Sequence, residues 1–180
     1  IEKKLKIKLN NKSSIVTFHP VTLEKDSLKQ LKQLLEAMKF FKDITFIITS
    51  PNSDTIGLRM KKIIMTYVKK NKNFVFRDSL GQLKYLSLIK HVDFVLGNSS
   101  SGIIEVPEMK KFTINVGNRQ KGRLMAKTII QCKPTIKDII NKIKLIYDKN
   151  KNKKYINSKK IYGSAGASMK IYRILKKKNF

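Results

Sequence analysis

Short apolar runs alternate regularly with longer amphipathic segments along this sequence, and few folds are compatible with such an alternation. Residues 43–50, DITFIITS, form a run rich in β-branched side chains, whereas residues 22–41 repeat apolar side chains at helical spacing, at Leu28, Leu31, Leu34, Leu35 and Met38. Such runs form strands buried on both faces of a sheet, and amphipathic helices cover those faces. Because strand and helix alternate at least four times, the sequence predicts an α/β fold with a Rossmann-like, doubly wound parallel sheet.

The individual elements follow from the same two patterns. Strands are expected at residues 13–20, 43–50, 73–79, 93–100 and 112–117, with a further short strand at 127–132. Helices are expected at 22–41, 55–70, 81–91, 101–110 with a stop near Pro107, 135–148, and in a final amphipathic segment that ends at Leu175. Residues 149–160, rich in Lys and Asn, are expected to be solvated and mobile.

The charge balance is strongly basic, but its distribution argues against a specific nucleic-acid site. Lys and Arg number 40 against 12 Asp and Glu, which gives a formal net charge of +28. The excess is mostly Lys, is scattered along the chain, and comes without Trp or an aromatic RNA-binding motif. We therefore expect weak, salt-sensitive attraction to polyanions and no specific nucleic-acid partner.

Cysteine content and apolar run length narrow the class of protein further. Cys132 is the single cysteine, so no intrachain disulfide forms, which fits a reducing compartment and a cytoplasmic protein. No apolar run approaches the roughly 18–20 residues that span a bilayer, so no membrane association is expected. The few His, Cys and clustered acids offer no metal site, no Walker loop or GxGxxG motif is present, and no cofactor is expected.

Small and polar residues gather at the predicted carboxyl ends of the strands. A doubly wound sheet binds its ligands at that edge, over the loops that follow the strands. These loops begin with His19-Pro20, Ser50-Pro51-Asn52, Asp78-Ser79, Gly97 to Gly102, and Gly117-Asn118-Arg119. The sequence therefore predicts a ligand site assembled from these loops.

The segment GNSSSGIIE, residues 97–105, has the properties of a diphosphate cradle. A Gly- and Ser-rich turn between strand and helix leaves N–H groups and hydroxyls free, and the helix N-terminus adds positive potential. Glu105, expected in the first turn of that helix, could accept hydrogen bonds from both hydroxyls of a ribose. The alternatives are that a serine of this turn caps the helix and that Glu105 stabilises the helix dipole.

Two further side chains at this edge can serve an anionic ligand. Arg119, in GNRQKGR, could pair with phosphate in a forked geometry, and Arg123 on that loop is a weaker candidate. His19 could donate to a phosphate, or act as an acid or base near neutral pH. The alternatives are a solvated arginine and a structural histidine, while His91 is expected to cap a helix and Cys132 to be a small, partly buried side chain.

These motifs resemble, in order and spacing, the C-terminal domain of UDP-N-acetylglucosamine 2-epimerases. The segments are TFHPVT, SPNSD, FRDSLGQLKYLSLIK, GNSSSGIIEVP and INVGNRQKGR, and the resemblance covers residues 16–127. The pair GNSSSGIIEVP and GNRQKGR is similar to the hydrolysing branch used in sialic acid and related syntheses. The resemblance implies the C-terminal half of a glycosyltransferase-B-type (GT-B) fold, with the substrate in the cleft between two domains.

The resemblance also implies roles for individual residues. Ser99 and Ser100 match serines that hold the diphosphate, and Glu105 matches an acid that binds the ribose. Arg119 matches an arginine on the phosphate side, and His19 matches a histidine implicated in substrate binding and catalysis. The predicted UDP-binding set is completed by Asn52, Asp54, Arg77, Ser79, Asn98, Ser101 and Gly102.

The resemblance implies an enzyme that eliminates UDP across C1 and C2 to give a glycal, to which water then adds with inversion at C2. In the hydrolysing branch the products of UDP-N-acetylglucosamine are N-acetylmannosamine and UDP. Elimination needs a base for the C2 proton and electrophiles for the leaving diphosphate. The family's carboxylates near C2 lie on an N-terminal domain that this sequence lacks, so we expect the chain alone to be inactive.

The expected organisation is one UDP-binding domain at residues 1–150, whose residues 1–12 link to an N-terminal domain. Residues 151–180 are expected to form a linker and a helix that packs back toward that domain. Near this helix the family motif YGDGNAS is replaced by YGSAGAS, residues 162–168, which lacks the acid and the amide. A homodimer is expected because family members commonly dimerise.

Several alternatives stay open from the sequence. A glycosyltransferase of the same architecture would use a similar cradle, and a non-catalytic module would bind a nucleotide-sugar without turnover. A basic nucleic-acid binder would show steep salt dependence and no preference for UDP. Within the epimerase family, a UDP-diacetamido-trideoxyhexose is an alternative substrate.

Overall fold

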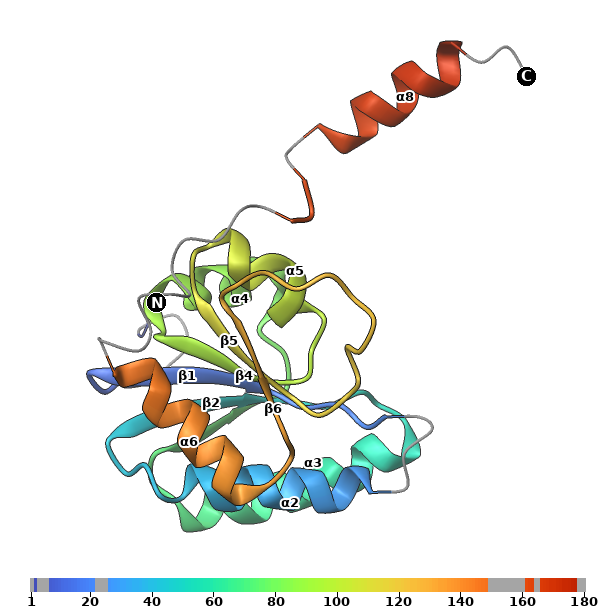
Figure 1. Cartoon of the computed structure of the whole chain (residues 1–180). Coiled ribbons are helices and arrows are strands. Elements are labelled where there is room, and N and C mark those ends of the chain that lie inside the picture. The colour runs from blue at the N-terminus through green and yellow to red at the C-terminus, as the bar shows by residue number, and fades with distance from the viewer. Residues whose placement is uncertain (1, 3–6, 22–25, 149–160, 164–165, 178–180) are drawn as a thin grey trace.

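The computed structural model shows an α/β domain built on one parallel sheet (Figure 1). It describes residues 2, 7–21, 26–148, 161–163 and 166–177. The strands lie in the order β3-β2-β1-β4-β5-β6, and all neighbouring pairs are parallel, which confirms the doubly wound prediction. Their bounds are Lys12–Thr17 (β1), Ile44–Thr49 (β2), Phe74–Arg77 (β3), Phe94–Gly97 (β4), Phe112–Val116 (β5) and Ile129–Cys132 (β6).

Helices cover both faces of the sheet. One face carries α2 (Ser27–Met38), α3 (Thr55–Lys70) and α6 (Ile136–Tyr147), and the other carries α4 (Gly81–His91) and α5 (Ser101–Glu108) (Figure 1). Neighbouring strand residues alternate between the two cores, because successive side chains of a strand point to opposite faces. Val16, Ile48 and Leu96 pack toward α2, α3 and α6, whereas Ile15, Ile47 and Val95 pack toward α4 and α5.

Several elements differ in length from the sequence prediction. The first strand ends at Thr17 instead of residue 20, and the fourth ends at Gly97 instead of residue 100. The backbone leaves the sheet there, and Gly97 has a φ of 134°, which favours glycine. The helix expected at 22–41 spans Ser27–Met38, with residues 22–25 outside the described part of the chain. Helix α5 passes Pro107 by one residue and ends at Glu108, as expected near a residue without a backbone donor.

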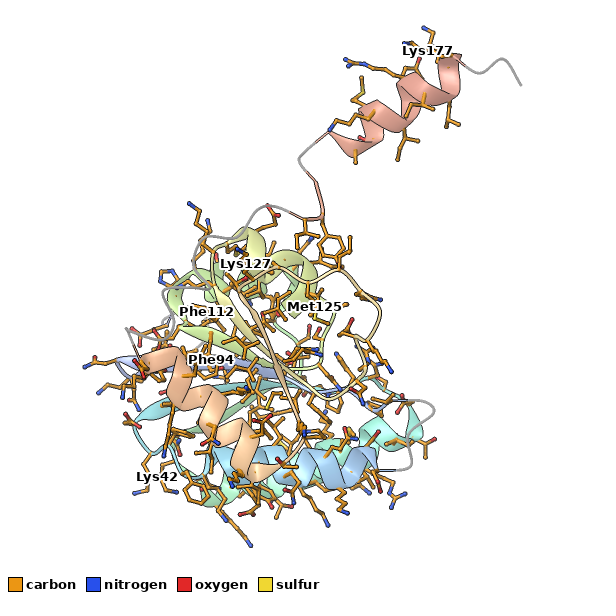
Figure 2. All side chains as sticks on the ribbon, in the orientation of Figure 1. Lys42, Phe94, Phe112, Met125, Lys127 and Lys177 are labelled. Carbon is orange, nitrogen blue, oxygen red and sulfur yellow. The ribbon has the colours of Figure 1, made fainter. Side chains whose placement is uncertain are left out.

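The last helix, α8 (Ala167–Lys177), stands apart from the sheet (Figure 1, Figure 2). It extends beyond the expected end at Leu175. None of its described side chains is buried, and its exposed apolar residues are Met169, Ile171, Tyr172, Ile174 and Leu175. An apolar stripe of this kind is typical of a helix that packs against another surface. The predicted mobility of residues 149–160 concerns a segment outside the described residues.

None of the helices that the structure describes is long and apolar enough to cross a membrane.

Candidate functional site

The loops after β1 and β4 are joined by one side chain at the carboxyl edge of the sheet. Asn98 is 1% exposed; its Oδ1 accepts from the His19 backbone N–H (2.7 Å) and its Nδ2 donates to the His19 carbonyl (2.9 Å). Gly97 allows this approach, because a Cβ at that position would lie 2.0 Å from the Thr17 carbonyl oxygen. The backbone that presents His19 is therefore fixed to the end of β4.

The loop after β5 meets the same point. Arg119 donates through Nη1 to the Asn98 carbonyl (3.1 Å), and the buried Gln120 amide donates to that carbonyl as well (2.8 Å). Three loops thus converge on Asn98, and the predicted residues His19 and Arg119 come close enough to interact electrostatically. Asn98 itself, predicted to contact UDP, has both side-chain ends bonded to the His19 backbone.

The His19 imidazole is uncharged at neutral pH. Its pKa is lowered to about 4, chiefly by burial and then by the positive charge of Arg119, whereas Asp54 raises it. Asp54 also caps α3 by accepting a hydrogen bond from the Gly57 N–H (2.6 Å). His19 Nδ1 has no partner among the described residues. A neutral imidazole can donate and accept hydrogen bonds while Arg119 supplies positive charge, so the pair suits an anionic oxygen ligand.

Helix α5 presents free backbone donors at its start. The N–H groups of Ser99, Ser100 and Ser101 have no acceptor within the described part of the chain, as is usual for the first turn of a helix. Ser100 is the N-cap residue but makes no side-chain capping bond, and the Ser101 hydroxyl donates to Tyr85 Oη instead (2.8 Å). The capping alternative is therefore not seen for Ser100, and the diphosphate cradle stays a prediction.

A cavity of about 360 Å³ lies between α4, α5 and the ends of β1 and β2. Ser99, Ser101 and Glu105 line it from the α5 side, and Ser79 and Tyr85 line it from the α4 side. A smaller hollow of about 280 Å³ shares Ser79 and contains the predicted residue Asn52. Cavities of a few hundred cubic ångströms are typical of small-molecule sites.

The position of Glu105 differs from the prediction. It lies in the second turn of α5, since that helix begins at Ser101 and carries no acid in its first turn. The favourable interaction of a carboxylate with the helix dipole falls off beyond the first turn. The alternative that Glu105 only stabilises the helix dipole is therefore less well supported. Glu105 instead faces Tyr85 across the cavity: burial and then the Glu105 charge raise the pKa of the tyrosine.

Two other predicted residues have structural partners. Gly102 is buried, and a Cβ there would lie 2.7 Å from Thr113 Cγ2, so this glycine lets α5 pack closely on β5. The Thr113 hydroxyl also donates to the Gly102 carbonyl (2.7 Å). Arg77 donates through Nη1 to the Phe76 carbonyl (2.7 Å) and is not among the residues that line either hollow.

Other residues that line the cavity were not predicted from the sequence, namely Thr17, Thr49, Gln82, Tyr85 and Leu86. Thr17 and Thr49 are the last residues of their strands, and their hydroxyl oxygens lie 2.7 Å apart. The predicted strands ran past both positions, which concealed them. The three residues of α4 share one helical face, a signal that becomes visible once this helix is placed after a binding loop.

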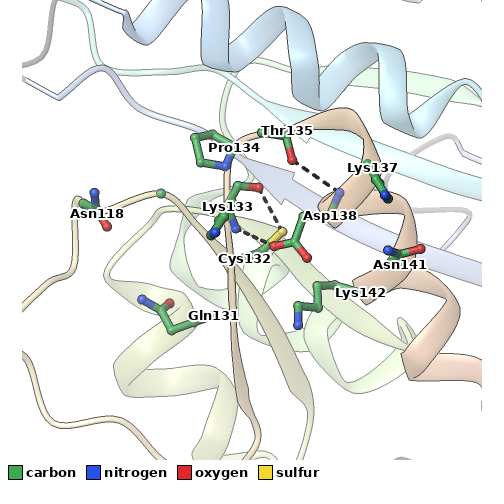
Figure 3. A pocket seen from close by; sticks show the side chains of 11 residues that line it. Asn118, Gln131, Cys132, Lys133, Pro134, Thr135, Lys137, Asp138, Asn141 and Lys142 are labelled. Carbon is green, nitrogen blue, oxygen red and sulfur yellow. Dashed lines mark hydrogen bonds between the residues drawn. The ribbon is translucent and has the colours of Figure 1, made fainter.

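A larger hollow of about 650 Å³ lies at the same edge, between β6 and the start of α6 (Figure 3). Lys133, Lys137 and Lys142 line it, and Asp138 accepts a hydrogen bond from the Lys133 N–H (2.7 Å) at the helix start. Cys132 is 4% exposed, which is more deeply buried than expected, and burial raises the pKa of its thiol. No group of three or more His, Cys, Asp or Glu placed to hold a metal ion occurs among the described residues.

Sequence comparison places the chain in a known family. The family model described as UDP-N-acetylglucosamine 2-epimerase matches residues 1–176. The chain is 38% identical, over 86% of its length, to the GDP/UDP-N,N'-diacetylbacillosamine 2-epimerase (hydrolyzing) of Campylobacter jejuni. That match covers 39% of the relative, so the chain spans about two fifths of the length of this curated relative.

Solved structures agree on the fold. The UDP-GlcNAc 2-epimerase of Neisseria meningitidis, bound to UDP-GlcNAc, matches with a TM-score of 0.71 at 19% identity, over 98% of this chain and 47% of that one. The C-terminal domain of a group 1 family glycosyl transferase from Francisella tularensis matches with a TM-score of 0.58 at 17% identity, over 86% and 85%. These likenesses confirm the half of a GT-B-type fold that was predicted. The family itself follows from the model match and the 38% identity: the chain belongs to the UDP-N-acetylglucosamine 2-epimerase family.

Proposed function

We propose that this chain is the UDP-binding part of an epimerase of the hydrolysing branch, which acts on UDP-N-acetylglucosamine or a related UDP-sugar. The observation that carries the proposal is the cavity beside α5, which Ser99, Ser101 and Glu105 line at a helix start whose first N–H groups have no acceptor among the described residues. A nucleoside diphosphate offers the matching groups in one molecule, namely anionic oxygens, ribose hydroxyls and a flat base. Membership of the epimerase family supports the same ligand.

In this proposal the diphosphate lies over the start of α5. The N–H groups of residues 99–101 and the Arg119 guanidinium donate to its oxygens, and the positive end of the helix favours its charge. Glu105, one turn further along the helix, accepts hydrogen bonds from the ribose hydroxyls. The base then rests against Leu80, Tyr85 and Leu86 on the α4 side of the cavity.

The same donors would assist the elimination. As the C1–O bond breaks, negative charge grows on the diphosphate, and Arg119 and the α5 amides stabilise it. His19 is neutral at pH 7, since its pKa is about 4, so it can donate a hydrogen bond to the departing UDP. The proton at C2 goes to carboxylates that the family resemblance assigns to another domain. We therefore propose that this chain alone binds UDP but does not turn over the sugar nucleotide.

The exposed apolar face of α8 supports the proposal that another domain packs against this helix. None of the described side chains of α8 is buried, although the helix is strongly amphipathic. The relatives are about twice as long as this chain, because it covers 39% of the Campylobacter jejuni protein and 47% of the Neisseria meningitidis one. We propose that α8 packs back on the remaining part of the longer enzyme.

The sugar is a separate question, and a second candidate has support. The Campylobacter jejuni relative is named for N,N'-diacetylbacillosamine, so a UDP-diacetamido-trideoxyhexose is the alternative substrate. The nucleotide contacts would be the same for both sugars. A glycosyltransferase role is supported by fold alone, at 17% identity, and is outweighed by the family match.

Calorimetric titration of the chain with UDP at moderate salt tests this proposal, with AMP as the control nucleotide. We expect saturable UDP binding that weakens about tenfold or more in Glu105→Ala and Arg119→Ala, and no binding of AMP. Equal binding of both nucleotides that vanishes as salt rises would show that the +28 charge is responsible. Turnover of UDP-N-acetylglucosamine by the purified chain would contradict the proposed inactivity.

A further inference from the structure

Asn98 and Gln120 form a buried polar pair behind the proposed site. They are 1% and 2% exposed, and neither is among the residues that line the cavity. The Asn98 N–H donates to the Thr17 carbonyl (3.1 Å), and its side chain holds the His19 backbone in both directions. Its carbonyl accepts from Arg119 and Gln120. One buried residue therefore links the end of β1 to both side chains proposed to contact the diphosphate.

Gln120 supports this link but is unfavourable in one respect. Its Nε2 donates to the Asn98 carbonyl at 2.8 Å, whereas its Oε1 is buried without a partner in the described residues. A buried acceptor without a partner destabilises the folded state, and an apolar side chain of similar shape would not. Stability alone therefore does not account for Gln120. Its bond instead holds the loop that carries the neighbouring Arg119.

We propose that Asn98 and Gln120 are positioning residues, which hold His19 and Arg119 in one arrangement for an anionic diphosphate. The inference rests on the proposed function, since it takes the ligand to be a diphosphate. Donors that are already ordered bind more tightly, because less side-chain and loop freedom is lost on binding. Both residues act through the positions of two others and need no contact with the ligand.

The variant Gln120→Met separates positioning from stability. Methionine has a similar length, removes the donor to the Asn98 carbonyl, and removes the unpartnered oxygen. We expect the thermal midpoint to be unchanged or higher, whereas the dissociation constant for UDP rises about five- to tenfold. Unchanged UDP affinity would overturn the proposal. So would a variant that fails to fold, because that result would assign Gln120 to the stability of the domain.

Gln33→Met is the matched control. Gln33 also joins two elements, since its Oε1 accepts a hydrogen bond from the Ile136 N–H at the start of α6 (3.1 Å). It lines neither the cavity beside α5 nor the smaller hollow that contains Asn52. We expect Gln33→Met to lower the thermal midpoint and to leave UDP affinity unchanged, the reverse of Gln120→Met. A similar loss of UDP affinity in both variants would overturn the proposal.

Imidazole NMR gives a second readout that does not need UDP. The chain has two histidines, His19 and His91, so the two signals can be assigned with one variant. The charged groups that face His19 are Arg119 and Asp54. When Gln120→Met loosens Arg119, we expect the His19 titration to move up toward its ordinary value while the His91 signal does not change. If the wild-type chain does not bind UDP, the proposed function fails, but an unmoved His19 titration would still overturn this inference separately.

Discussion

The two edges of the sheet differ in how fully their buried polar side chains are hydrogen-bonded. At the amino edge, Asn73 donates from Nδ2 to the carbonyls of Phe41 (2.9 Å) and Ile44 (2.8 Å). Asp93 accepts from the Ser13 N–H at 2.9 Å at the same edge. These side chains complete the hydrogen bonds of nearby backbone, so they stabilise the ends of the strands.

At the carboxyl edge, several hydrogen-bonding groups stay unused. Buried side-chain atoms without a partner in the described chain are His19 Nδ1, Asn115 Oδ1, Gln120 Oε1 and Thr128 Oγ1. The first three lie near this edge, since Asn115 is level with the last residue of β4, and the fourth precedes β6 at the amino edge. Three of these four unpartnered atoms thus lie near the carboxyl edge, although none of their residues lines the cavity.

The largest effect is expected at the closest backbone contact of the carboxyl edge. Gly97→Ala would place a Cβ 2.0 Å from the Thr17 carbonyl oxygen at a φ of +134°. We expect the free energy of unfolding in urea to fall by more than about 3 kcal/mol. Gly122→Ala is the control, because its φ is +85° but no atom lies within 4 Å of the added Cβ, and we expect it to lose about 1 kcal/mol. Equal losses would show that the close approach is unimportant.

The next largest effect is expected at the amino edge, on stability and not on UDP binding. Asn73→Ala removes the donor to two carbonyls, so we expect the free energy of unfolding to fall by about 2 kcal/mol. The measurement is urea denaturation, followed by UDP titration under conditions where the variant is folded. UDP affinity should equal that of the wild type. A weaker affinity would mean that the amino edge also serves the ligand.

A smaller effect is expected at the carboxyl edge, on binding alone. Glu105→Gln keeps the shape of the side chain but removes the charge that faces the cavity. We expect UDP affinity to fall about tenfold, or about 1.4 kcal/mol, with the thermal midpoint unchanged. Glu108→Gln changes an exposed acid of the same helix and should leave affinity unaltered. Equal affinities in the two variants would remove Glu105 from the proposed ribose contact.

The smallest effect is a pH dependence caused by His19. Its pKa is 6.5 in the unfolded chain and about 4 in the folded one, so the folded state binds fewer protons between these values. The free energy of unfolding should therefore fall as pH drops from about 6.5 toward 4, by about 1 kcal/mol for a partly solvated imidazole. Urea midpoints at pH 7 and pH 5 measure this, and His19→Gln should reduce the difference. The same pH difference in the wild type and in His19→Gln would contradict the buried, neutral His19.

The fold was predictable because its signals are local. Apolar runs and helical spacing identify each element, and alternation alone places the helices on both faces of a parallel sheet. Because all parallel strands end at one edge, the sequence also brought His19, Ser99 and Arg119 into one region. The strand ends were less predictable, since SSIVTFHP stays apolar beyond Thr17, where the chain leaves the sheet.

The remaining features depend on tertiary packing. Tyr85 reaches Ser101 from a different helix, and nothing in the sequence near either residue shows that the two meet. Asn98 and Gly102 lie in the cradle motif, but the structure shows Asn98 bonded to the His19 backbone and Gly102 packed against β5. The motif therefore predicted where these residues lie in the fold, but not which contacts each of them makes.

In the proposed function, the start of α5 holds the diphosphate of UDP. Amide NMR of the labelled chain during a UDP titration tests it most directly. We expect saturable shifts of the Ser99, Ser100 and Ser101 amide signals, while the amide signals of Asn73 and Asp93 at the amino edge stay in place. The opposite result would be shifts that spread over the Lys-rich surface and disappear with added salt, while the amide signals at the start of α5 do not move. That result would contradict a diphosphate site at the start of α5.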